Sequence, residues 1–510
     1  MCRQWQSARP STGKPGLFTT ERQQLSTADL DDEGKMNEAI AAADTAWILA
    51  ATAAVGIMVP GLAMFYGGMV SIKNTLNMAM MTFGAFALVG VLWIIFGYSA
   101  TLGDSIGGAG LLGDPLEYFG SSKLLDAPAE PGLPPALIAA FQLLFAAITV
   151  ALISGAVADR MKFGAWMLFA GVWATLVYFP VAHWVFAFDS ADGSVTGGWI
   201  ANKLAAIDFA GGTAVHMNAG VAALALVLVL GKRGTFPNPP RPHSLPLTML
   251  GSGILFFGWF GFNGGSALAA GSSAGVVVLN TIAAACAGIC AWLVTEKVRQ
   301  GHASSLGASS GLIAALVGIT PACGAVSPIG AVIIGAVSGA VCCLAVSMKF
   351  RLGVDDSLDV VGIHLVGGII GTILIGFLAV PEAPNGATGL FYGGGVDALW
   401  RQTVAVIAVF AYTFIVTIVI AKVLDMVMGL RVPAEHEADG LDSVIHGESA
   451  WIMETATLTT TVVTPAATVA AAEAITAEAA ASDGDSETTE TGKSEADKAD
   501  ADTPATAAAE

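Results

Sequence analysis

The sequence predicts an all-α integral membrane protein, and three observations support this fold class. The 510 residues are 55% hydrophobic and 12% charged, about half the charged fraction of roughly 25% that is typical of soluble domains. Apolar runs long enough to cross a bilayer, which takes about 20 residues, recur along the chain. Lysine and arginine are concentrated in alternate connections between these runs. A soluble fold is therefore excluded.

The apolar runs between charged residues predict eleven transmembrane helices. They lie at residues 45–70, 76–99, 135–158, 163–187, 205–230, 246–266, 274–296, 304–322, 328–348, 358–380 and 402–428. The tracts 242–295 and 300–348 contain no charged residue, apart from the histidines, and each is long enough for two spans. In the first tract a Gly/Ser-rich hairpin near 264–273 separates the spans.

The charges in the connections predict the orientation of the helices across the membrane, because cytoplasmic connections are enriched in lysine and arginine. If the first helix runs inward, the inner connections hold the basic residues Lys73, Arg160, Lys162, Lys232, Arg233, Arg241, Lys297, Arg299, Lys349, Arg351, Lys422 and Arg431. The outer connections then hold only Lys123, Lys203 and Arg401. We therefore expect a cell-membrane (plasma or inner membrane) protein with its N-terminus outside and its C-terminus in the cytoplasm.

The two ends of the chain differ from the membrane domain, 44–428. Residues 1–43 are polar and lack the apolar core of a secretory signal; we expect Met36 to be the true start. Residues 429–451 mix charges with apolar anchors, which predicts a segment that docks on the cytoplasmic face. Residues 452–510 are acidic and rich in Ala and Thr, which predicts a disordered tail. Because many acids lie in these ends, the net charge of -18 does not indicate a nucleic-acid partner.

Two histidines lie inside apolar runs, and each has an aspartate eight residues upstream: Asp208 before His216, and Asp356 before His364. An ionisable group at membrane depth costs about 2.5–3.5 kcal/mol, which indicates a functional reason for its presence. Helix five starts outside and helix ten inside, so the two Asp-to-His segments run in opposite directions and form an inverted repeat. A rise of about 1.5 Å per residue then brings the two histidines together near the midplane.

Two neutral imidazoles in contact can share one proton, because each ring donates from one nitrogen and accepts at the other. Burial disfavours charging both rings. Such a pair could line a narrow path that passes a small hydrogen-bonding molecule and obstructs a hydrated cation. The alternative is that the histidines only bridge helices. Asp208 and Asp356 could likewise only cap helix ends, although Asp208 could also hold a cation at the outer mouth.

Aromatic residues gather near the outer ends of helices three and six. Phe141 and Phe145 lie one turn apart on the same face of helix three. The segment 258–266 adds Trp259, Phe262 and the hydroxyl of Ser266. A cation over such rings gains about 0.5–2 kcal/mol. The alternative is that these rings are anchors at the membrane interface.

On these motifs, the chain resembles the Amt/Mep/Rh ammonium transporter family, on its bacterial Amt side, from about residue 44 to residue 451. The motifs are Phe141-Gln142-x-x-Phe145, Ala158-Asp159-Arg160-Met161-Lys162-Phe163, Asp208-Phe-Ala-Gly-Gly-Thr-Ala-Val-His216, Gly258-Trp-Phe-Gly-Phe-Asn-x-Gly-Ser266, Thr320-Pro-Ala-Cys-Gly324, Asp355-Asp356-x-x-Asp359-Val-x-Gly-x-His364 and the segment 429–451. The resemblance implies a fold of two five-helix inverted-repeat halves plus an eleventh helix. It also implies a homotrimer in the lipid bilayer with one pore in each subunit.

The resemblance also implies roles for individual residues. The outer recruitment site would be formed by Phe141, Phe145 and Ser266, with Asp208 as its essential carboxylate. The gate would be formed by Phe145 and Phe262, with Trp259 as an aromatic on its pore side. The pore would be lined by His216 and His364.

One position departs from the family pattern. Where the family usually has Pro-x-Ala-His-x-x-Trp, this chain reads Pro180-Val181-Ala182-His183-Trp184-Val185-Phe186. We therefore expect Phe186 in the recruitment site, although a phenyl ring has a weaker π-face than indole and no N–H. Trp184 lies two residues away around the helix and does not replace it.

We expect the protein to capture ammonium, with methylammonium as a related substrate, to deprotonate it, and to conduct ammonia with net proton or charge transfer. One alternative is an ammonium sensor on the same scaffold, and another is a channel for water or urea. A PII-type signalling protein is the expected cytoplasmic partner. No nucleophile–base pair and no metal-ligand spacing of Cys or His is visible, so we expect no enzyme, no cofactor and no metal.

Overall fold

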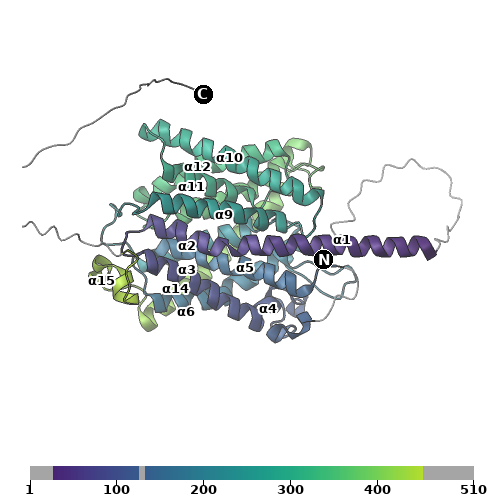
Figure 1. The fold of residues 1–510 in the computed structure, drawn as a ribbon, viewed down its shortest axis with the longest axis horizontal. Helices are drawn as coiled ribbons and strands as arrows, with labels where there is room; N and C mark the ends of the chain where they lie inside the picture. The colour runs from purple at the N-terminus through teal and green to yellow at the C-terminus, as the bar shows by residue number, and fades with distance from the viewer. Residues whose placement is uncertain (1–26, 126–131, 452–510) are drawn as a thin grey trace, which may run out of the picture. The chain divides into compact units, whose positions relative to one another are not determined.

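The computed structural model describes residues 27–125 and 132–451, which form a bundle of helices (Figure 1). Within these residues no β-strand occurs. Ten helical stretches are long and apolar enough to cross a membrane, and α11 (Ser305–Ile319) is a shorter apolar helix. Together they make eleven, the predicted number. The predicted disordered tail, 452–510, and the first 26 residues lie outside the described part.

The spans follow the chain in the predicted order. The first five consist of α1 (Thr27–Gly56) with α2 (Met58–Met69); α3 (Thr75–Leu92), η1 (Trp93–Gly97) and α4 (Tyr98–Leu102); α5 (Pro135–Ile153) with η4 (Ser154–Val157); α6 (Phe163–Trp173), η5 (Ala174–Tyr178) and α7 (Phe179–Phe186); and η7 (Gly212–Met217) with α8 (Asn218–Leu230). The next six consist of α9 (Leu245–Gly265), α10 (Ser272–Gln300), α11, α12 (Pro328–Leu352), η8 (Val361–Leu365) with α13 (Val366–Leu378), and α14 (Asp397–Met428).

Short helices lie in the connections. They are η2 (Ile106–Gly108), η3 (Phe119–Leu125), η6 (Ile200–Leu204), η9 (Leu390–Tyr392), α15 (Ala434–Asp439) and α16 (Leu441–His446). Apolar side chains remain exposed on the outside of the bundle, for example Leu250 at 56%, Val294 at 63% and Ile415 at 61%. Such a surface is stable against lipid tails, which accounts for a fold that is apolar both inside and outside.

The two halves pack alike. In the first half α3 packs against α5 and α6, and in the second half α10 packs against α11 and α12. At the centre, η7 packs against α13 and η8 packs against α8, so the start of each histidine-bearing segment meets the body of the other. This crossing is the arrangement expected of two segments that run in opposite directions.

Two glycines allow this close crossing. Gly220 and Gly368 each lie four residues after the histidine of their own segment. A Cβ on Gly220 would come 2.3 Å from the backbone nitrogen of Leu365, and a Cβ on Gly368 would come 2.8 Å from the carbonyl oxygen of Gly212. Small residues at these positions let the backbones approach closely, as is common where membrane helices cross.

Proline or left-handed backbone explains three of the differences between the predicted and the observed helices. The first span breaks at Ile57, because Pro60 has no N–H to donate to the carbonyl of Gly56. The fifth span is helical only from Gly212, since Ala205 and Gly211 have φ values of 53° and 111°. The eighth ends at Ile319, one residue before the Thr320-Pro321 pair.

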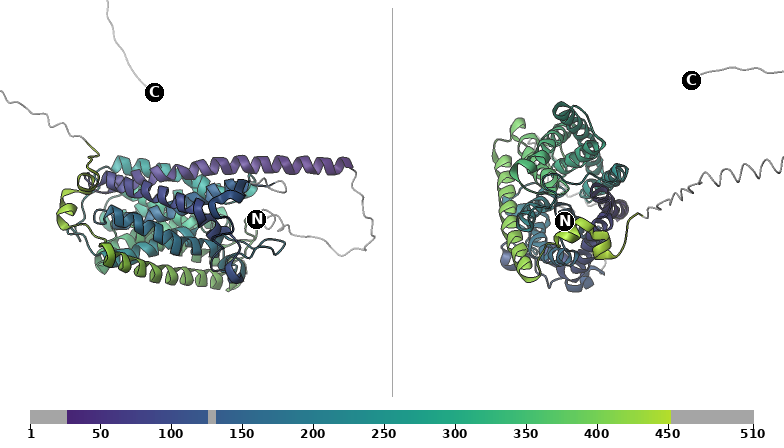
Figure 2. Two further views of the ribbon diagram at one scale, coloured as in Figure 1. Left: turned by 90° about the horizontal axis from the view of Figure 1, so that it is seen from below. Right: turned by 90° about the vertical axis from the view of Figure 1, so that its left-hand side faces the viewer.

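The start of the first span also differs. We predicted a helix from residue 45, but α1 already begins at Thr27 and extends beyond the bundle at the end opposite α15 (Figures 1 and 2). Residues 34–43 contain four Ala and one each of Lys, Met and Glu, all of which are strong helix formers. The helix therefore continues past the apolar run that the hydropathy pattern identifies.

The segment 429–451 lies across the opposite end of the bundle, where α15 is labelled (Figures 1 and 2). The carboxylate of Asp442, 2% exposed, accepts hydrogen bonds from the backbone N–H groups of Leu76 (3.0 Å) and Asn77 (2.7 Å) in the first turn of α3. It thus caps a membrane helix from a distant part of the chain. Leu441 N also donates to Asn74 Oδ1 at 2.7 Å. We refer to this end of the bundle as the C-terminal end.

Candidate functional site

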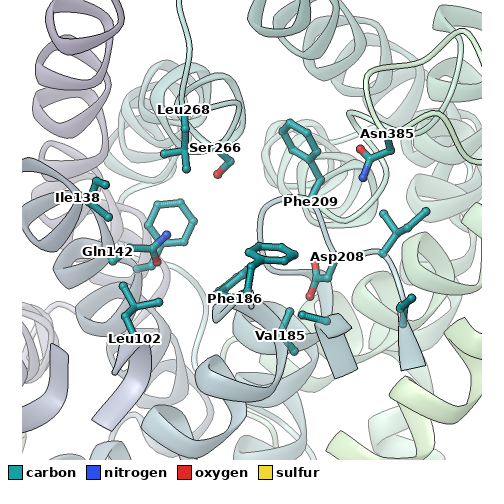
Figure 3. A pocket seen from close by; sticks show the side chains of 16 residues that line it. Leu102, Ile138, Gln142, Val185, Phe186, Asp208, Phe209, Ser266, Leu268 and Asn385 are labelled. Carbon is teal, nitrogen blue, oxygen red and sulfur yellow. The ribbon is translucent and has the colours of Figure 1, made fainter. Parts of the chain in front are cut away.

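A cavity of about 220 Å³ opens at the end of the bundle opposite the C-terminal end, between α5, α7 and the segment after η6. Figure 3 shows its walls, with Gln142 on one side of the space and the neighbouring side chains of Phe186 and Asp208 on the other. Sixteen residues line it: Leu102, Ile138, Gln142, Phe145, Val185, Phe186, Phe188, Ala201, Ala205, Ala206, Ile207, Asp208, Phe209, Ser266, Leu268 and Asn385. Among these described residues, Asp208 carries the single charge. We call this space the outer cavity.

Asp208 is held by backbone geometry. Its Oδ1 accepts from the N–H groups of Gly211 (2.8 Å) and Gly212 (2.6 Å), and its Oδ2 accepts from the N–H groups of Thr213 (2.8 Å) and Ala214 (3.2 Å) and from the Thr213 hydroxyl. These are the free donors at the start of η7. The carboxylate therefore caps this helix and, at the same time, sets a negative charge beside the outer cavity.

Phe145 forms the floor of the outer cavity, with the ring of Phe186 beside it and the ring of Phe262 behind it. Phe145 and Phe262 are stacked, with ring centroids 4.0 Å apart and planes 14° apart. The ring of Phe186 stands perpendicular to Phe145 at 6.5 Å. Phe145 lines the outer cavity, whereas Phe262 lines a second cavity beneath it. The stacked pair thus separates the two spaces.

Phe141 lies behind this floor. It is fully buried, its centroid is 4.9 Å from that of Phe145, and it is not among the residues that line the outer cavity. A Cβ on Gly265 would come 2.9 Å from its ring, so the glycine leaves space for it. Phe141 therefore supports the position of Phe145 by packing.

The second cavity holds about 20 Å³, roughly the space of one water-sized molecule. It is lined by Met58, Leu62, Phe65, Ile148, Leu152, His216, Leu255, Trp259, Phe262, Ile313 and His364. All but the two histidines and the indole N–H are apolar. We call this space the pore cavity.

The two histidines meet in the pore cavity. Nδ1 of His216 lies 3.3 Å from Nδ1 of His364, and the ring centroids are 5.4 Å apart. One nitrogen of this contact must donate and the other accept. Nε2 of His216 is buried and has no hydrogen-bond partner among the described residues. Both histidines occur in π-helical turns, η7 and η8, which are frequent at functional sites.

Trp259 fixes one wall of the pore cavity. Its ring lies over His216, with centroids 5.5 Å and planes 22° apart, and its N–H donates to the Thr320 hydroxyl at 2.9 Å. Because that N–H is already used, the indole presents an apolar face to the histidine. Trp259 thus positions the imidazole through stacking.

The polar lining of the outer cavity includes the predicted site residue Ser266 and two residues to which the sequence analysis assigned no role, Gln142 and Asn385. Ser266 donates its hydroxyl hydrogen to the carbonyl of Phe262 at 2.7 Å, which leaves oxygen lone pairs free. Gln142 and Asn385 also line the cavity and appear on opposite sides of it in Figure 3. Gln142 lies within a quoted motif, but no pattern in the sequence indicated Asn385.

The predicted departure at Phe186 can be located directly. Phe186 lines the outer cavity, whereas Trp184 does not. The indole N–H of Trp184 donates to the carbonyl of Leu111 at 2.8 Å, and its ring packs against Tyr412 at 4.8 Å. Trp184 is therefore turned away from the cavity.

At the C-terminal end, Asp356 corresponds to Asp208. It accepts from the N–H groups of Val360 (3.1 Å) and Val361 (2.7 Å) at the start of η8. Burial raises the pKa of Asp356 to about 6, although the charge of Lys349 acts in the opposite direction. Asp208 lines the outer cavity, whereas Asp356 is 2% exposed at the C-terminal end, so the two caps share a structural role and differ in surroundings.

A buried ionic cluster ties the C-terminal end together. Arg233 contacts Asp159 at 3.0 Å and Asp355 at 2.8 Å. Burial raises the pKa of Asp159 despite this arginine. Burial would also raise the pKa of Asp355, but the hydrogen bonds and charge of Arg233 outweigh it and hold that pKa below 3.8. No group of three or more His, Cys, Asp or Glu residues that could hold a metal ion occurs in the described residues.

Known proteins resemble this chain both in sequence and in structure. Residues 46–451 match the Ammonium Transporter Family. The chain is 53% identical over 431 residues to an ammonium transporter of Mycobacterium tuberculosis, which covers 80% of this chain and 90% of that protein. The crystal structure of Saccharomyces cerevisiae Mep2 is similar with a TM-score of 0.70 and 36% identity, over 77% of this chain and 88% of that one. A sensor Amt protein is similar with a TM-score of 0.73 and 27% identity, over 80% and 98%.

Proposed function

Because this chain belongs to the ammonium transporter family, whose members are transporters and not enzymes, we propose that it captures ammonium in the outer cavity and conducts it as ammonia. One observation carries the proposal. A charged cavity, a stacked pair of rings and a water-sized apolar cavity with two histidines follow one another along one path. Each part suits one step of the process.

Capture takes place beside Asp208. Its carboxylate is the single charge on the described cavity wall, and a neighbouring opposite charge favours a cation. Phe145 and Phe186 present aromatic rings and Ser266 presents an oxygen acceptor. A cation gains about 0.5–2 kcal/mol from an aromatic face. The combination supports recruitment of a small monocation over a neutral solute.

Deprotonation takes place at the ring pair of Phe145 and Phe262. Ammonium gives up one N–H proton there to Nε2 of His216, which has no hydrogen-bond partner among the described residues and whose ring centroid lies 5.9 Å from that of Phe262. The remaining ammonia continues in neutral form, because the pore cavity has room for about one small molecule and almost no polar lining. A hydrated cation would lose its water shell in that space without replacement. One or both rings must turn to let the molecule pass, since they are stacked at 4.0 Å.

The released proton moves separately along the histidine pair. The Nδ1–Nδ1 contact of 3.3 Å supports a shared proton. Ammonia and the proton recombine on the far side, so each turnover carries one positive charge. Transport is therefore electrogenic in this proposal.

A sensor is the second candidate function, because a sensor Amt protein has the same fold. In that case binding in the outer cavity would change the segment 429–451 and signal to a partner. That segment contacts α3 through Asp442, which makes such coupling physically possible. The two candidates differ in flux: a transporter conducts ammonium equivalents at a measurable rate, and a pure sensor does not.

The proposal extends to orientation and assembly. We place the outer cavity outside the cell and the C-terminal end in the cytoplasm of a cell-membrane protein, following the distribution of basic residues. The chain then acts as a homotrimer, with one pore per subunit, and the segment 429–451 receives a PII-type signalling protein. The homotrimer and the binding of a PII-type signalling protein are predictions.

Charge-resolved transport by purified protein in liposomes tests the proposed function. We expect wild type to give an inward current on an ammonium pulse. His216→Ala should lower that current by about tenfold or more, because it removes one member of the proton relay. His302→Ala, which changes an exposed histidine outside both cavities, should leave the current as in wild type.

Three other results would overturn parts of the proposal. Ammonia flux without current would leave a neutral gas channel. Binding without flux would favour the sensor. A current equal to wild type in His216→Ala would exclude the histidine pair from the path of the proton.

A further inference from the structure

The carboxylate of Asp208 has no free acceptor to offer a cation directly. Its two oxygens accept five hydrogen bonds, four from backbone N–H groups and one from the Thr213 hydroxyl. A carboxylate provides about four lone-pair sites. Asp208 therefore acts on a bound cation through its charge, and the hydrogen-bond acceptors must come from other residues.

An ammonium ion has four N–H donors to satisfy. Aromatic faces of Phe145 and Phe186 can accept some of them, and the Ser266 oxygen can accept another. A donor left without an acceptor inside the cavity costs free energy. The composition of the wall thus predicts at least one further neutral acceptor.

Asn385 lies where such an acceptor is required. It lines the outer cavity and belongs to the loop between α13 and η9. In Figure 3 it projects beside Phe209, on the same side of the cavity as Asp208. Its backbone N–H donates to the carbonyl of Gly324 at 2.9 Å, which anchors the loop to the turn after α11.

No hydrogen bond from the described residues fixes the side-chain oxygen of Asn385. Its Oδ1 is buried and has no hydrogen-bond partner among the described residues. A Cβ on Gly324 would come 2.8 Å from this oxygen, so glycine leaves the space that the carboxamide occupies. Terminal amide torsions have two broad minima about half a turn apart. A half turn moves the unpaired oxygen to the cavity side without breaking a hydrogen bond to that oxygen.

From these contacts we propose that the Asn385 carboxamide oxygen is a further ligand of the cation in the outer cavity and sets the preference for ammonium over methylammonium. This inference rests on the proposed function of the cavity. Ammonium uses one more N–H donor than methylammonium, so loss of one acceptor weakens ammonium more. Asn385 contributes to specificity by hydrogen bonding, and Asp208 contributes by charge.

Two substitutions test the proposal in liposomes through the half-saturation concentration and the maximal current. Asn385→Leu should raise the half-saturation concentration for ammonium about three- to tenfold, raise that for methylammonium less, and keep the maximal current within about twofold. Asn385→Asp, which has the same shape, should lower the half-saturation concentration for ammonium, because it adds a charged acceptor.

A charge-matched control separates coordination from general attraction. Glu382 is exposed on the same loop and does not line the cavity. The double variant Asn385→Asp/Glu382→Gln keeps the loop charge of wild type and should retain the tighter binding. Glu382→Gln alone should bind as wild type does. A double variant that returns to wild-type affinity would reduce the effect to surface charge and overturn the proposal.

A binding measurement on the purified protein keeps this test independent of transport. Ammonium chloride should raise the thermal unfolding midpoint of wild type more than that of Asn385→Leu. If wild type binds ammonium but does not conduct it, the proposed transport is wrong. The binding measurement would still show whether Asn385 is a ligand. If Asn385→Leu and the double variant both match wild type in affinity and in the ammonium-to-methylammonium ratio, Asn385 is no ligand. If Asn385→Leu misfolds, the isosteric variants Asn385→Asp and Asn385→Asp/Glu382→Gln still test whether residue 385 is a ligand.

Discussion

At the scale of single residues, the proposed capture of ammonium depends on charge, ring faces and hydrogen-bond acceptors. Asp208 supplies charge while its oxygens are occupied by η7. Phe145 belongs to two structures at once, the floor of the outer cavity and the stacked pair with Phe262. We therefore expect a substitution at Phe145 to change both the proposed capture and the proposed passage. Phe186 lines only the outer cavity of the two, so we expect its substitution to change capture alone.

Phe186→Trp should tighten capture. An indole ring attracts a cation more strongly than a phenyl ring, and we expect the half-saturation concentration for ammonium or methylammonium uptake to fall about two- to fivefold. The matched control is Phe257→Trp, because Phe257 is 56% exposed on the outside of α9. Uptake kinetics in cells or liposomes provide the measurement. An unchanged affinity in Phe186→Trp would count against a place for this residue in the recruitment site.

The sequence identified some residues of the site and not others. Ionisable and aromatic residues inside apolar runs, such as His216 and Phe145, are easy to identify. An ionisable group costs free energy in the membrane, and a large ring needs space. Leu62 and Leu255 also line the pore cavity, but a leucine in a membrane helix is equally stable against lipid or protein. Asn385 lies in a loop where Asn is common. Its role depends on a cavity built by other segments.

At the scale of elements, the two histidine-bearing segments depend on each other. Each begins with an aspartate cap, enters a π-helical turn and passes a glycine at the crossing. The caps were predictable from Asp near a helix start. The π-helical turns were not, because their hydrogen-bond pattern depends on the packing around them and not on a residue period. These turns orient both imidazoles into the same space.

Gly220→Ala should force the two segments apart. The added Cβ would lie 2.3 Å from the backbone nitrogen of Leu365, and a backbone atom cannot move aside like a flexible side chain. Overpacking of this kind costs about 1–3 kcal/mol. We expect a lower thermal unfolding midpoint in detergent and a lower ammonium current in liposomes.

The control for this prediction is Gly253→Ala in α9. A Cβ on Gly253 meets nothing within 4 Å, and alanine is the better helix former by about 1 kcal/mol. This variant should be as stable as wild type or slightly more stable. Equal stability and current for Gly220→Ala and Gly253→Ala would mean that the crossing does not need glycine.

At the scale of the whole molecule, the C-terminal end is held by buried charges from parts of the chain far apart in sequence. Arg233 follows α8, Asp159 follows η4, and Asp355 follows α12. The side chains are 3%, 6% and 1% exposed. Such a cluster connects both halves of the bundle. It lies beside the strand-like stretch where Val432 N donates to the Arg160 carbonyl at 3.0 Å, so it also supports the segment 429–451.

Arg233→Ala should destabilise the fold by about 3–5 kcal/mol at neutral pH, because two buried carboxylates lose their partner. Unfolding by denaturant in detergent micelles measures the loss. The control is Arg401→Ala: Arg401 pairs with Asp397 at 2.6 Å, but the two side chains are 37% and 66% exposed. An exposed pair contributes about 0–1 kcal/mol.

The same variant should show a defined pH dependence. Arg233 holds the pKa of Asp355 below 3.8 in spite of burial. A carboxyl with a depressed pKa contributes stability that is present above its unfolded pKa and is lost as the pH falls through its folded pKa. Without Arg233 the buried carboxyls take up protons more easily. The stability gap between wild type and Arg233→Ala should therefore narrow from neutral pH toward about pH 4, and a constant gap would contradict this account.

Much of the architecture was accessible from the sequence. The eleven spans, their order and the change of character near residue 429 follow from transfer free energies, which each stretch of chain expresses by itself. The exceptions occurred where local backbone chemistry overrides hydropathy, as at Pro60 in the first span and at Gly211 before the fifth. The helix before residue 45 was missed because propensity, and not hydropathy, maintains it.

The sequence by itself determined that this chain is a multi-span membrane protein of the ammonium transporter family, and it marked the few ionisable and aromatic residues whose burial needs a purpose. Only the tertiary structure decided that Phe145 stacks on Phe262, that His216 contacts His364, and that the pore cavity admits about one small molecule. The physical reason is that the sequence pattern of an apolar helix face is the same whether that face contacts lipid or lines a pore. Contacts between spans far apart in the chain give each side chain its neighbours.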